Sequence, residues 1–244
     1  DIHDLKQTEQ LLREKQRLLA DSQAIAHIGS WMVDLKKQTI SWSDEGLRLF
    51  GLSDTENYLP REQFFTLLHP DDVLKMQDYI KSRLEGQQTA PTEFRTRPIN
   101  NQYRWLLGNG ILEKDADGKP LRMIGTVQDI TERKNAEQTI FNLAYYDPLT
   151  QLPNRHLTLD RLRQLLLSRT LQHHHGAVLF INVDDFRNLN DTQGHTTGDL
   201  LLLAISKRLQ RYVHQDDTIA RVGGDEFVLI LDALDSNLEQ AAIE

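Results

Sequence analysis

Residues 221–227 read Arg-Val-Gly-Gly-Asp-Glu-Phe, and this stretch decides the architecture of the C-terminal part of the chain. Apolar residues stand on both sides of two adjacent glycines, a pattern typical of two strands joined by a tight turn. The glycines, Gly223 and Gly224, leave room for a ligand to approach the backbone. Two carboxylates, Asp225 and Glu226, follow at the turn, and hard carboxylate oxygens suit Mg²⁺. The stretch predicts a hairpin with an acidic tip, and by itself it favours a tip that binds nothing.

Upstream of this hairpin, an apolar run at residues 177–183 leads into a long polar segment at residues 182–199. The apolar run predicts a buried strand in a sheet whose strands are well covered by helices. We expect the polar segment to be a loop at the strand end, where open α/β sheets place ligands. Its backbone N–H groups and Arg187 can hold phosphates, and Asn190 and Asp199 can hydrogen-bond to a base edge. The segment lacks the G-x-x-x-x-G-K-[ST] signature of P-loop enzymes, and alone it would suggest only a solvated loop.

Three motifs in order, at residues 147–155, 185–199 and 223–227, resemble the GGDEF family of diguanylate cyclases. The resemblance implies an α/β fold similar to nucleotidyl cyclases and polymerase palms. It implies a reaction in which two GTP-loaded domains face each other and join two GTP into cyclic di-GMP. It assigns the nucleotide site as follows: Asp185, Phe186 and Arg187 around the phosphates, Asn190 and Asp199 at the guanine, and Gly223 and Gly224 beside the nucleotide.

The same resemblance implies a Mg²⁺ site that acts together with GTP. Its ligands are Asp225 and the backbone carbonyl of Val183. Glu226 is a further ligand or helps to deprotonate the attacking hydroxyl. Asn182 stands where the family has its first metal-binding Asp, so this position is a weak ligand without negative charge. We therefore expect weakened cyclase activity.

Two further positions depart from the family pattern. The product-inhibition motif Arg-x-x-Asp reads His-Gln-Asp-Asp at residues 214–217, and without Arg the bidentate capture of a phosphate or guanine is lost. Gln151 stands where the family has Gly, and we expect this change to alter only a turn. The resemblance also implies that the nucleotide domain is truncated at Glu244, near which a further helix is expected to begin.

Residues 22–134 resemble a PAS domain with its trailing PAC-type segment, with an antiparallel sheet and helices on one of its faces. The resemblance is carried by residues 31, 40–43, 49–51, 68–72, 103–105, 117–118, 125 and 129–134. Members of the family bind haem, flavin, small metabolites or nothing, so the sequence leaves the ligand unknown. The tryptophans suit a core better than cofactor contacts, and His69 suits a helix-entry loop with Asp as N-cap better than a haem ligand. The tract of residues 173–175, three histidines, suits a solvated loop.

Charged helices are predicted at residues 1–22 and 132–146. Leu5, Leu12 and Leu19 recur every seven residues in the first of them, which is compatible with a dimeric coiled coil or with a helix lying on its own domain. The junctions at residues 1–12 and 129–140 share residues at one fixed offset, which suggests that the chain begins at the tail of a preceding copy of the PAS-like unit. We expect residues 129–134, with Thr131 as helix N-cap, to carry the sensor's signal.

Composition limits the remaining possibilities. The chain has 244 residues, a net charge of −8 and no cysteine. The charge argues against nucleic-acid binding, and the lack of cysteine excludes disulfides, Cys–metal sites and a flavin–Cys adduct. Neither a signal peptide nor a membrane-spanning run is recognisable, so we expect a cytoplasmic location, although a parent protein could be membrane-anchored.

Together these features predict four segments: an N-terminal signalling helix (1–22), a PAS sensor (23–131), a helical linker (132–146) and an α/β GGDEF domain (147–244). The leading function is a sensor-regulated, homodimeric cyclic di-GMP module that binds GTP. One alternative is a degenerate GTP-binding domain that controls a downstream phosphodiesterase domain of the EAL type. The other is a dimerising sensor scaffold without catalysis.

Overall fold

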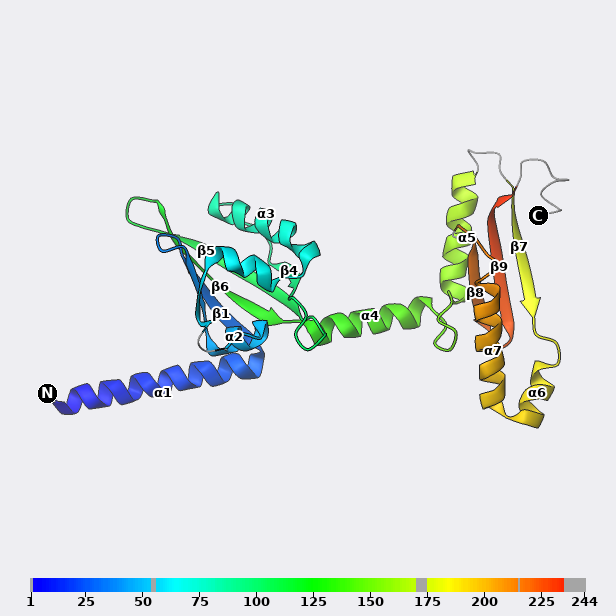
Figure 1. The fold of residues 1–244 in the computed structure, drawn as a ribbon, viewed down its shortest axis with the longest axis horizontal. Helices are drawn as coiled ribbons and strands as arrows, with labels where there is room; N and C mark the ends of the chain where they lie inside the picture. The colour runs from blue at the N-terminus through cyan, green and yellow to red at the C-terminus, as the bar shows by residue number, and fades with distance from the viewer. Residues whose placement is uncertain (1, 54–55, 170–174, 215, 235–244) are drawn as a thin grey trace. The chain divides into compact units, whose positions relative to one another are not determined.

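The computed structural model describes residues 2–53, 56–169, 175–214 and 216–234, and the chain divides into two compact units, Asp1–Asn135 and Ala136–Glu244. The boundary falls within one helix, α4 (Thr131–Tyr145). Figure 1 shows the ribbon of each unit, coloured along the chain. Two of the three histidines at residues 173–175, position 215, and the helix expected near Glu244 lie outside the described residues.

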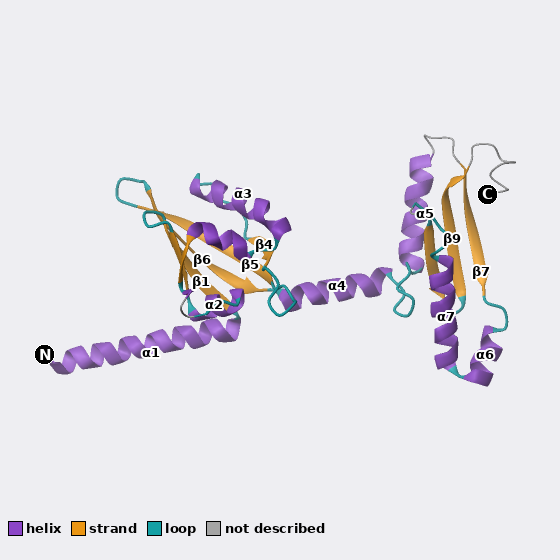
Figure 2. Ribbon diagram, viewed as in Figure 1, coloured by secondary structure: helices purple, strands orange, loops and turns teal. Residues whose placement is uncertain are grey.

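The first unit contains a six-stranded antiparallel sheet with the order β3-β2-β1-β6-β5-β4. Its elements are α1 (Ile2–Ala26), β1 (Ile28–Asp34), β2 (Thr39–Trp42), α2 (Asp44–Phe50), β3 (Tyr58–Pro60), η2 (Arg61–Leu67), η3 (Pro70–Asp72), α3 (Val73–Leu84), β4 (Thr92–Arg95), β5 (Trp105–Lys114), β6 (Pro120–Asp129) and α4. The core lies between one face of this sheet and α2, η2 and α3 (Figure 2). The predicted antiparallel one-sheet fold is confirmed.

Local sequence explains where the helices of this unit begin. Ser43 precedes α2, and its hydroxyl accepts a hydrogen bond from the backbone N–H of Gly46, which satisfies a donor left free at the helix start. Leu49 and Phe50 on this helix are buried against the sheet. The prediction that an Asp caps the helix after His69 is wrong in detail. Asp72 occupies the N-cap position of α3, but its carboxylate makes no cap hydrogen bond and instead accepts from Arg95 Nε at 2.9 Å.

Helix α1 extends four residues further than the predicted 1–22 and exposes its apolar stripe. Its last turns approach β1, where Gln23 Nε2 donates to Ser30 Oγ at 3.3 Å. The leucines and isoleucine of the stripe are each more than half exposed: Leu11, Leu12, Leu18, Leu19 and Ile25. The stripe is therefore not packed on its own unit, which argues against a helix lying on its own domain and leaves the surface free for a partner.

The second unit contains a three-stranded antiparallel sheet with the order β7-β9-β8. Its elements are α5 (Arg155–Arg169), β7 (His175–Asn182), α6 (Phe186–Gln193), α7 (His195–Leu209), β8 (Thr218–Gly223) and β9 (Glu226–Leu234). Leu202 on α7 packs against Ile219 and Phe227 on one face of the sheet. On the other face, leucines of α5 pack against Ala220 and Val228.

The prediction that β7 is well covered is wrong for the described residues. Phe180 is 81% exposed and Val178 is 41% exposed. Both are paired with residues of β9 that face α5, namely Val228 and Ile230. Because α5 packs over β8 and β9, the outer strand β7 keeps its apolar side chains uncovered on that face. A run of apolar residues thus predicted the strand but not its surroundings.

The described helices also bear on membrane insertion. None of the helices within the described ranges combines the length and apolar composition that crossing a bilayer requires.

Candidate functional site

The hairpin tip and the end of strand β7 lie side by side in the second unit. Gly224 forms the turn with φ +50°, a conformation that glycine adopts without steric cost. The backbone N–H of Val183 donates to the carbonyl oxygen of Asp225 at 3.3 Å. One residue earlier, Asn182 pairs with Glu226 across β7 and β9. The four residues that the sequence suggests as metal ligands therefore meet at one end of the sheet.

The segment at residues 182–199 is not the predicted loop, because most of it folds into α6 and the start of α7. Within α6, Phe186 and Leu189 are partly buried, whereas Arg187 and Asn188 are exposed. Only two apolar side chains therefore anchor the helix, too few for a helical period to show in the sequence. The helix begins after Asp185, which has φ +55° and makes no side-chain cap hydrogen bond.

The three residues assigned to the phosphates occupy different environments. Asp185 and Arg187 are exposed at the first turn of α6, where free N–H groups and the helix dipole favour an anion. The ring of Phe186 instead packs with Ile181 and Leu202 in the core. Phe186 therefore anchors the first turn of α6 to the core, and its place around the phosphates stays a prediction.

Asn190 on α6 and Asp199 on α7 belong to two helices that pack closely. An added Cβ on Gly198 would lie 2.0 Å from the Oδ1 atom of Asn190, so only glycine permits this approach. The Oδ1 atom of Asn190 is buried and has no hydrogen-bond partner among the described residues. A buried acceptor without a donor is costly, and a ligand N–H would satisfy it. Asp199 is exposed next to it.

Arg221 begins the stretch at residues 221–227 but was not among the predicted site residues. Its Nη1 atom lies 3.0 Å from both carboxylate oxygens of Asp147, and its Nη2 donates to the carbonyl oxygen of Gly224 at 2.6 Å. Its backbone N–H donates to the carbonyl oxygen of Pro153 at 3.0 Å. One side chain thus ties the hairpin tip to the segment at residues 147–155. The available signal was that Asp147 opens the first motif and Arg221 stands two residues before the third, but their pairing was not predictable from spacing.

Asp147 is held in its charged form. Burial raises the pKa of its carboxyl, but hydrogen bonds from Thr150 and the ion pair with Arg221 outweigh burial and keep this pKa below its ordinary value. The backbone N–H and the hydroxyl of Thr150 both donate to Oδ2 at 2.7 Å. The carboxylate therefore orders its own turn and the hairpin tip together.

The turn at Gln151 requires a left-handed backbone conformation, because this residue has φ +59°. This left-handed conformation costs an L-residue about 1–2 kcal/mol, which glycine avoids. The side-chain amide recovers part of this cost by donating to the carbonyl oxygen of Pro148 at 2.9 Å. We expect Gln151→Gly to raise the free energy of unfolding of the second unit by about 1 kcal/mol, as measured by urea titration.

Gln151→Ala is the matched control for this prediction. It also removes the amide but keeps the Cβ atom, so the left-handed strain remains and no stabilisation is expected. Equal effects of the two substitutions would show that the side-chain hydrogen bond, and not backbone strain, decides the outcome.

The residues at the hairpin tip fit a magnesium ion that arrives with a nucleotide. The available donors are carboxylate, amide and carbonyl oxygens, which hard cations prefer. Within the described part of the chain, no three His, Asp or Glu side chains converge into a closed metal cage. Mg²⁺ is ordinarily held by one or two carboxylates together with substrate phosphates and water, so Asp225 and Glu226 suffice for that mode.

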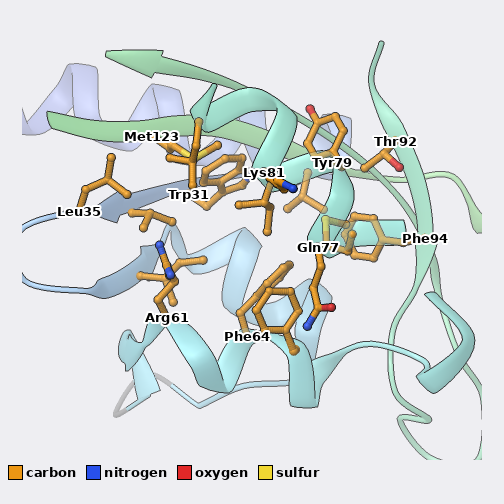
Figure 3. A pocket seen from close by; sticks show the side chains of 18 of the residues that line it. Trp31, Leu35, Arg61, Phe64, Gln77, Tyr79, Lys81, Thr92, Phe94 and Met123 are labelled. Carbon is orange, nitrogen blue, oxygen red and sulfur yellow. The ribbon is translucent and has the colours of Figure 1, made fainter. Parts of the chain in front are cut away.

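A second candidate site is a cavity of about 470 Å³ in the first unit, between the sheet and the helices above it. Aromatic and aliphatic side chains form most of its wall, among them Trp31, Trp42, Phe50, Phe64, Met76 and Phe94. Figure 3 shows Arg61, Gln77 and Lys81 at the same cavity, contributed by η2 and α3. Trp42 is buried as expected of a core residue, but both it and Trp31 also line the cavity.

His69 lies at a helix entry, as its sequence context predicts. Its Nδ1 atom accepts a hydrogen bond from the backbone N–H of Asp71 at 3.3 Å, and its ring packs edge-on against Tyr103. The described residues that line the cavity include no histidine. His69 therefore stabilises the entry to α3.

The junction between the sheet and α4 is held by a set of hydrogen bonds. Asp129 Oδ1 accepts from the backbone N–H of Thr131 at 2.9 Å. The hydroxyl of Thr131 accepts from the backbone N–H of Trp105 at 2.9 Å and does not cap α4. The prediction of Thr131 as the N-cap is therefore corrected. The carboxylate of Asp129 accepts a backbone N–H at the start of α4, and the hydroxyl of Thr131 connects that start to β5.

Strand β4 connects this junction to the cavity. Glu93 accepts hydrogen bonds from Arg133 at 2.8 Å and binds Lys134 Nζ at 2.7 Å. Hydrogen bonds from Lys134 and Arg133 lower the pKa of the Glu93 carboxyl. Its neighbours Thr92 and Phe94 line the cavity. Successive residues of one short strand thus contact the cavity and the first turn of α4.

Comparison with known proteins covers both units. Residues 39–127 match the family model of the PAS fold, and residues 144–244 match that of the diguanylate cyclase GGDEF domain. The chain is 32% identical over 179 residues to the uncharacterized protein y4lL of Sinorhizobium fredii, covering 70% of this chain and 22% of that protein. It is 45% identical over 103 residues to the bifunctional diguanylate cyclase/cyclic di-GMP phosphodiesterase MucR of Pseudomonas aeruginosa, covering 42% of this chain and 15% of that protein. The chain thus spans less than a quarter of either relative.

Among solved structures, a sensory box histidine kinase/response regulator of Burkholderia thailandensis is 23% identical, with a TM-score of 0.44. The match covers 59% of this chain and 95% of that chain. The two family models are consecutive and match the two structural units in order. The chain therefore combines a member of the PAS family with, after it, a member of the GGDEF diguanylate cyclase family.

Proposed function

We propose that the chain is a sensor-regulated module of cyclic di-GMP signalling, in which the PAS unit controls a GGDEF unit that binds GTP with Mg²⁺. The observation that carries this proposal is the hydrogen bond between Val183 and Asp225, which brings the acidic tip to the strand end that precedes α6. The 45% identity to a bifunctional diguanylate cyclase/cyclic di-GMP phosphodiesterase over this unit supports it. In the whole protein, two such units would join two GTP into cyclic di-GMP.

Different residues of the second unit bind the base, the phosphates and the metal ion of GTP. Asn190 and Asp199 hydrogen-bond to guanine, and the unpaired Oδ1 atom of Asn190 suits a base N–H group. Arg187 and the first turn of α6 hold the phosphates. Asp225 and Glu226 supply metal ligands, and Glu226 also accepts the proton of the attacking hydroxyl. A bound Mg²⁺ would lower the pKa of that hydroxyl and neutralise charge on the phosphoryl oxygens.

Removal of the Asp225 carboxylate tests GTP binding. We expect Asp225→Asn to weaken Mg²⁺-dependent GTP binding at least tenfold in calorimetry, because the metal loses a charged ligand. Asp160→Asn is the matched control, since this partly exposed aspartate lies on α5 and, among the described residues, pairs with the exposed side chains of His156 and Arg163. Equal GTP affinity of the Asp225 variant and the parent would reject the metal role of Asp225.

A non-catalytic GTP-binding domain is the second candidate. Asn182 favours it, because an amide oxygen brings no negative charge to the metal site. In that case GTP would bind without forming cyclic di-GMP and would regulate another domain of the whole protein. An EAL-type phosphodiesterase domain is the proposed target, since a relative is both diguanylate cyclase and cyclic di-GMP phosphodiesterase. Product analysis after GTP binding separates the two candidates.

Dimerisation is part of the leading proposal, because the reaction needs two GTP-loaded units. The exposed stripe of α1, with Leu11, Leu12, Leu18 and Leu19, provides a surface for a second copy. If GTP does not bind at all, the chain acts as a dimerising sensor scaffold. We place this function in the cytoplasm, where GTP is available. The contacts of Glu93 with Arg133 and Lys134 support residues 129–134 as the route from the sensor to α4.

A further inference from the structure

We propose that the PAS cavity binds a small apolar carboxylic acid in its anionic form, with the carboxylate held by Arg61 and Lys81. This inference rests on the proposed sensor role of the PAS unit and names the chemical class of its ligand. It is independent of the GTP site, because ligand binding to the PAS unit is measured without nucleotide.

The walls of the cavity require a mostly apolar ligand. Trp31, Phe50, Phe64 and Phe94 contribute aromatic surface to it, and Met76 adds a flexible thioether. Trp42 and Phe50 pack with ring centroids 6.0 Å apart, as do Phe50 and Phe64. Such rings favour aliphatic chains and other aromatic rings, which gain from burial and from edge-on contacts.

The volume limits the size of that ligand. The cavity measures about 470 Å³. If each non-hydrogen atom takes about 30 Å³, the share of one water molecule in the liquid, roughly 15 such atoms fill it. A phenyl-substituted or medium-chain fatty acid has about this number of atoms. A haem or a flavin nucleotide has more.

The charges at the cavity determine the polar end of the ligand. Arg61 from η2 and Lys81 from α3 both line the cavity, as Figure 3 shows. Across the described residues, no carboxylate lies within 4.0 Å of the guanidinium of Arg61 or the amine of Lys81. Glu85 also lines the cavity, but its carboxylate accepts from Gln87 Nε2 at 3.3 Å. Two cations against one carboxylate give the lining of the cavity a net positive charge.

Arg61 is the better anchor of the two cations. It is partly buried, whereas Lys81 is exposed. Its planar guanidinium can donate two parallel hydrogen bonds to one carboxylate, a geometry that an alcohol cannot match and an ammonium group would oppose. Because most of the remaining wall is apolar, the favoured position of the acid group is beside Arg61, with Lys81 as the second cation.

Three ligands that differ only in their polar group test this inference. Calorimetry with the whole chain should show binding of 4-phenylbutyrate, at least tenfold weaker binding of 4-phenylbutan-1-ol, and no detectable binding of 4-phenylbutylamine. An acid that binds no better than the alcohol, an amine that binds best, or failure of all three to bind would each overturn the inference.

Two variants locate the acid group. Arg61→Gln should lower the affinity for 4-phenylbutyrate about tenfold and leave the affinity for the alcohol within twofold. Lys36→Gln removes the same charge from the exposed turn between β1 and β2, outside the cavity, and should change neither affinity. Unchanged acid binding by Arg61→Gln would overturn the assignment. If Arg61→Gln does not fold, Lys81→Gln on the exposed face of α3 is measured instead, with a loss of acid affinity of about threefold or more expected.

Discussion

Replacement of Arg221 by alanine is expected to destabilise the second unit by about 3 kcal/mol, because it leaves the buried carboxylate of Asp147 without its partner. The side chains of Arg221 and Asp147 are only 12% and 15% exposed. The same substitution removes both hydrogen bonds to the carbonyl oxygen of Gly224. Urea titration of the whole chain, followed by hydrogen exchange at the amides of β8 and β9, measures the loss in this unit.

The pH dependence of this effect has a defined sign. The pKa of Asp147 is lower in the folded than in the unfolded state, so its ion pair contributes stability above the ordinary pKa of about 4. That contribution is lost as the pH falls through the folded-state pKa. The difference between the parent and Arg221→Ala should therefore shrink below about pH 4, and a difference that stays constant there would contradict the ion-pair explanation.

Arg163→Ala is the matched control for this experiment. Arg163 pairs with Asp160 at 3.2 Å, but the two side chains are 71% and 38% exposed. Exposed pairs contribute little, so this change should stay within about 0.5 kcal/mol. Arg221→Lys should recover only part of the stability, because one ammonium group cannot bridge Asp147 and Gly224 as the planar guanidinium does.

Replacement of Asn182 by aspartate is expected to lower the Mg²⁺ concentration needed for half-maximal GTP binding by about tenfold. The added charge lies opposite Glu226 and beside Asp225, where a second carboxylate strengthens the attraction for a divalent cation. Titration of GTP binding with Mg²⁺ in the whole protein measures this shift, and the rate of cyclic di-GMP formation is expected to rise with it.

Without metal, the same substitution is expected to be unfavourable, because it lowers the thermal stability. Like charges placed directly opposite in an antiparallel pair repel, so Asn182→Asp should slightly lower the thermal stability in the absence of Mg²⁺ and raise it when Mg²⁺ and GTP are present. Asn142→Asp is the control, because this exposed residue of α4 undergoes the same chemical change and has no assigned role in binding GTP or the metal. An identical Mg²⁺ requirement for the parent and Asn182→Asp would remove Asn182 as the cause of weakened activity.

Much of the architecture was accessible from patterns of a few residues. The Gly-Gly turn at residues 223–224 and the apolar run before residue 183 predicted strands that the structure confirms as β7, β8 and β9. These features depend on turn chemistry and on local alternation, which act over short stretches of chain. The helical segment at residues 186–193 was missed because only Phe186 and Leu189 anchor it.

The hydrogen-bond partners of side chains were harder to predict from the sequence than the helices and strands. Thr131 and Asp72 have residue types that cap helices, yet both bind elsewhere: Thr131 accepts from Trp105, and Asp72 accepts from Arg95. Whether such a residue caps a helix depends on which nearby donor its side-chain oxygen binds. In both cases that donor lies on a strand that is distant in the sequence. Sequence alone identifies such residues as polar and leaves their partner open.

By itself, the sequence determined that a sensor-like antiparallel sheet precedes an α/β unit with an acidic hairpin, and it predicted which residues bind a nucleotide and a metal. Only the tertiary structure decided which of these residues touch. Asp147 and Arg221 belong to separate motifs and meet because the strand pairing of β8 with β9 places Arg221 beside the turn that follows α4. The cavity with Arg61 and Lys81 at its mouth likewise arises from packing, since no local pattern specifies how η2, α3 and the sheet enclose a space.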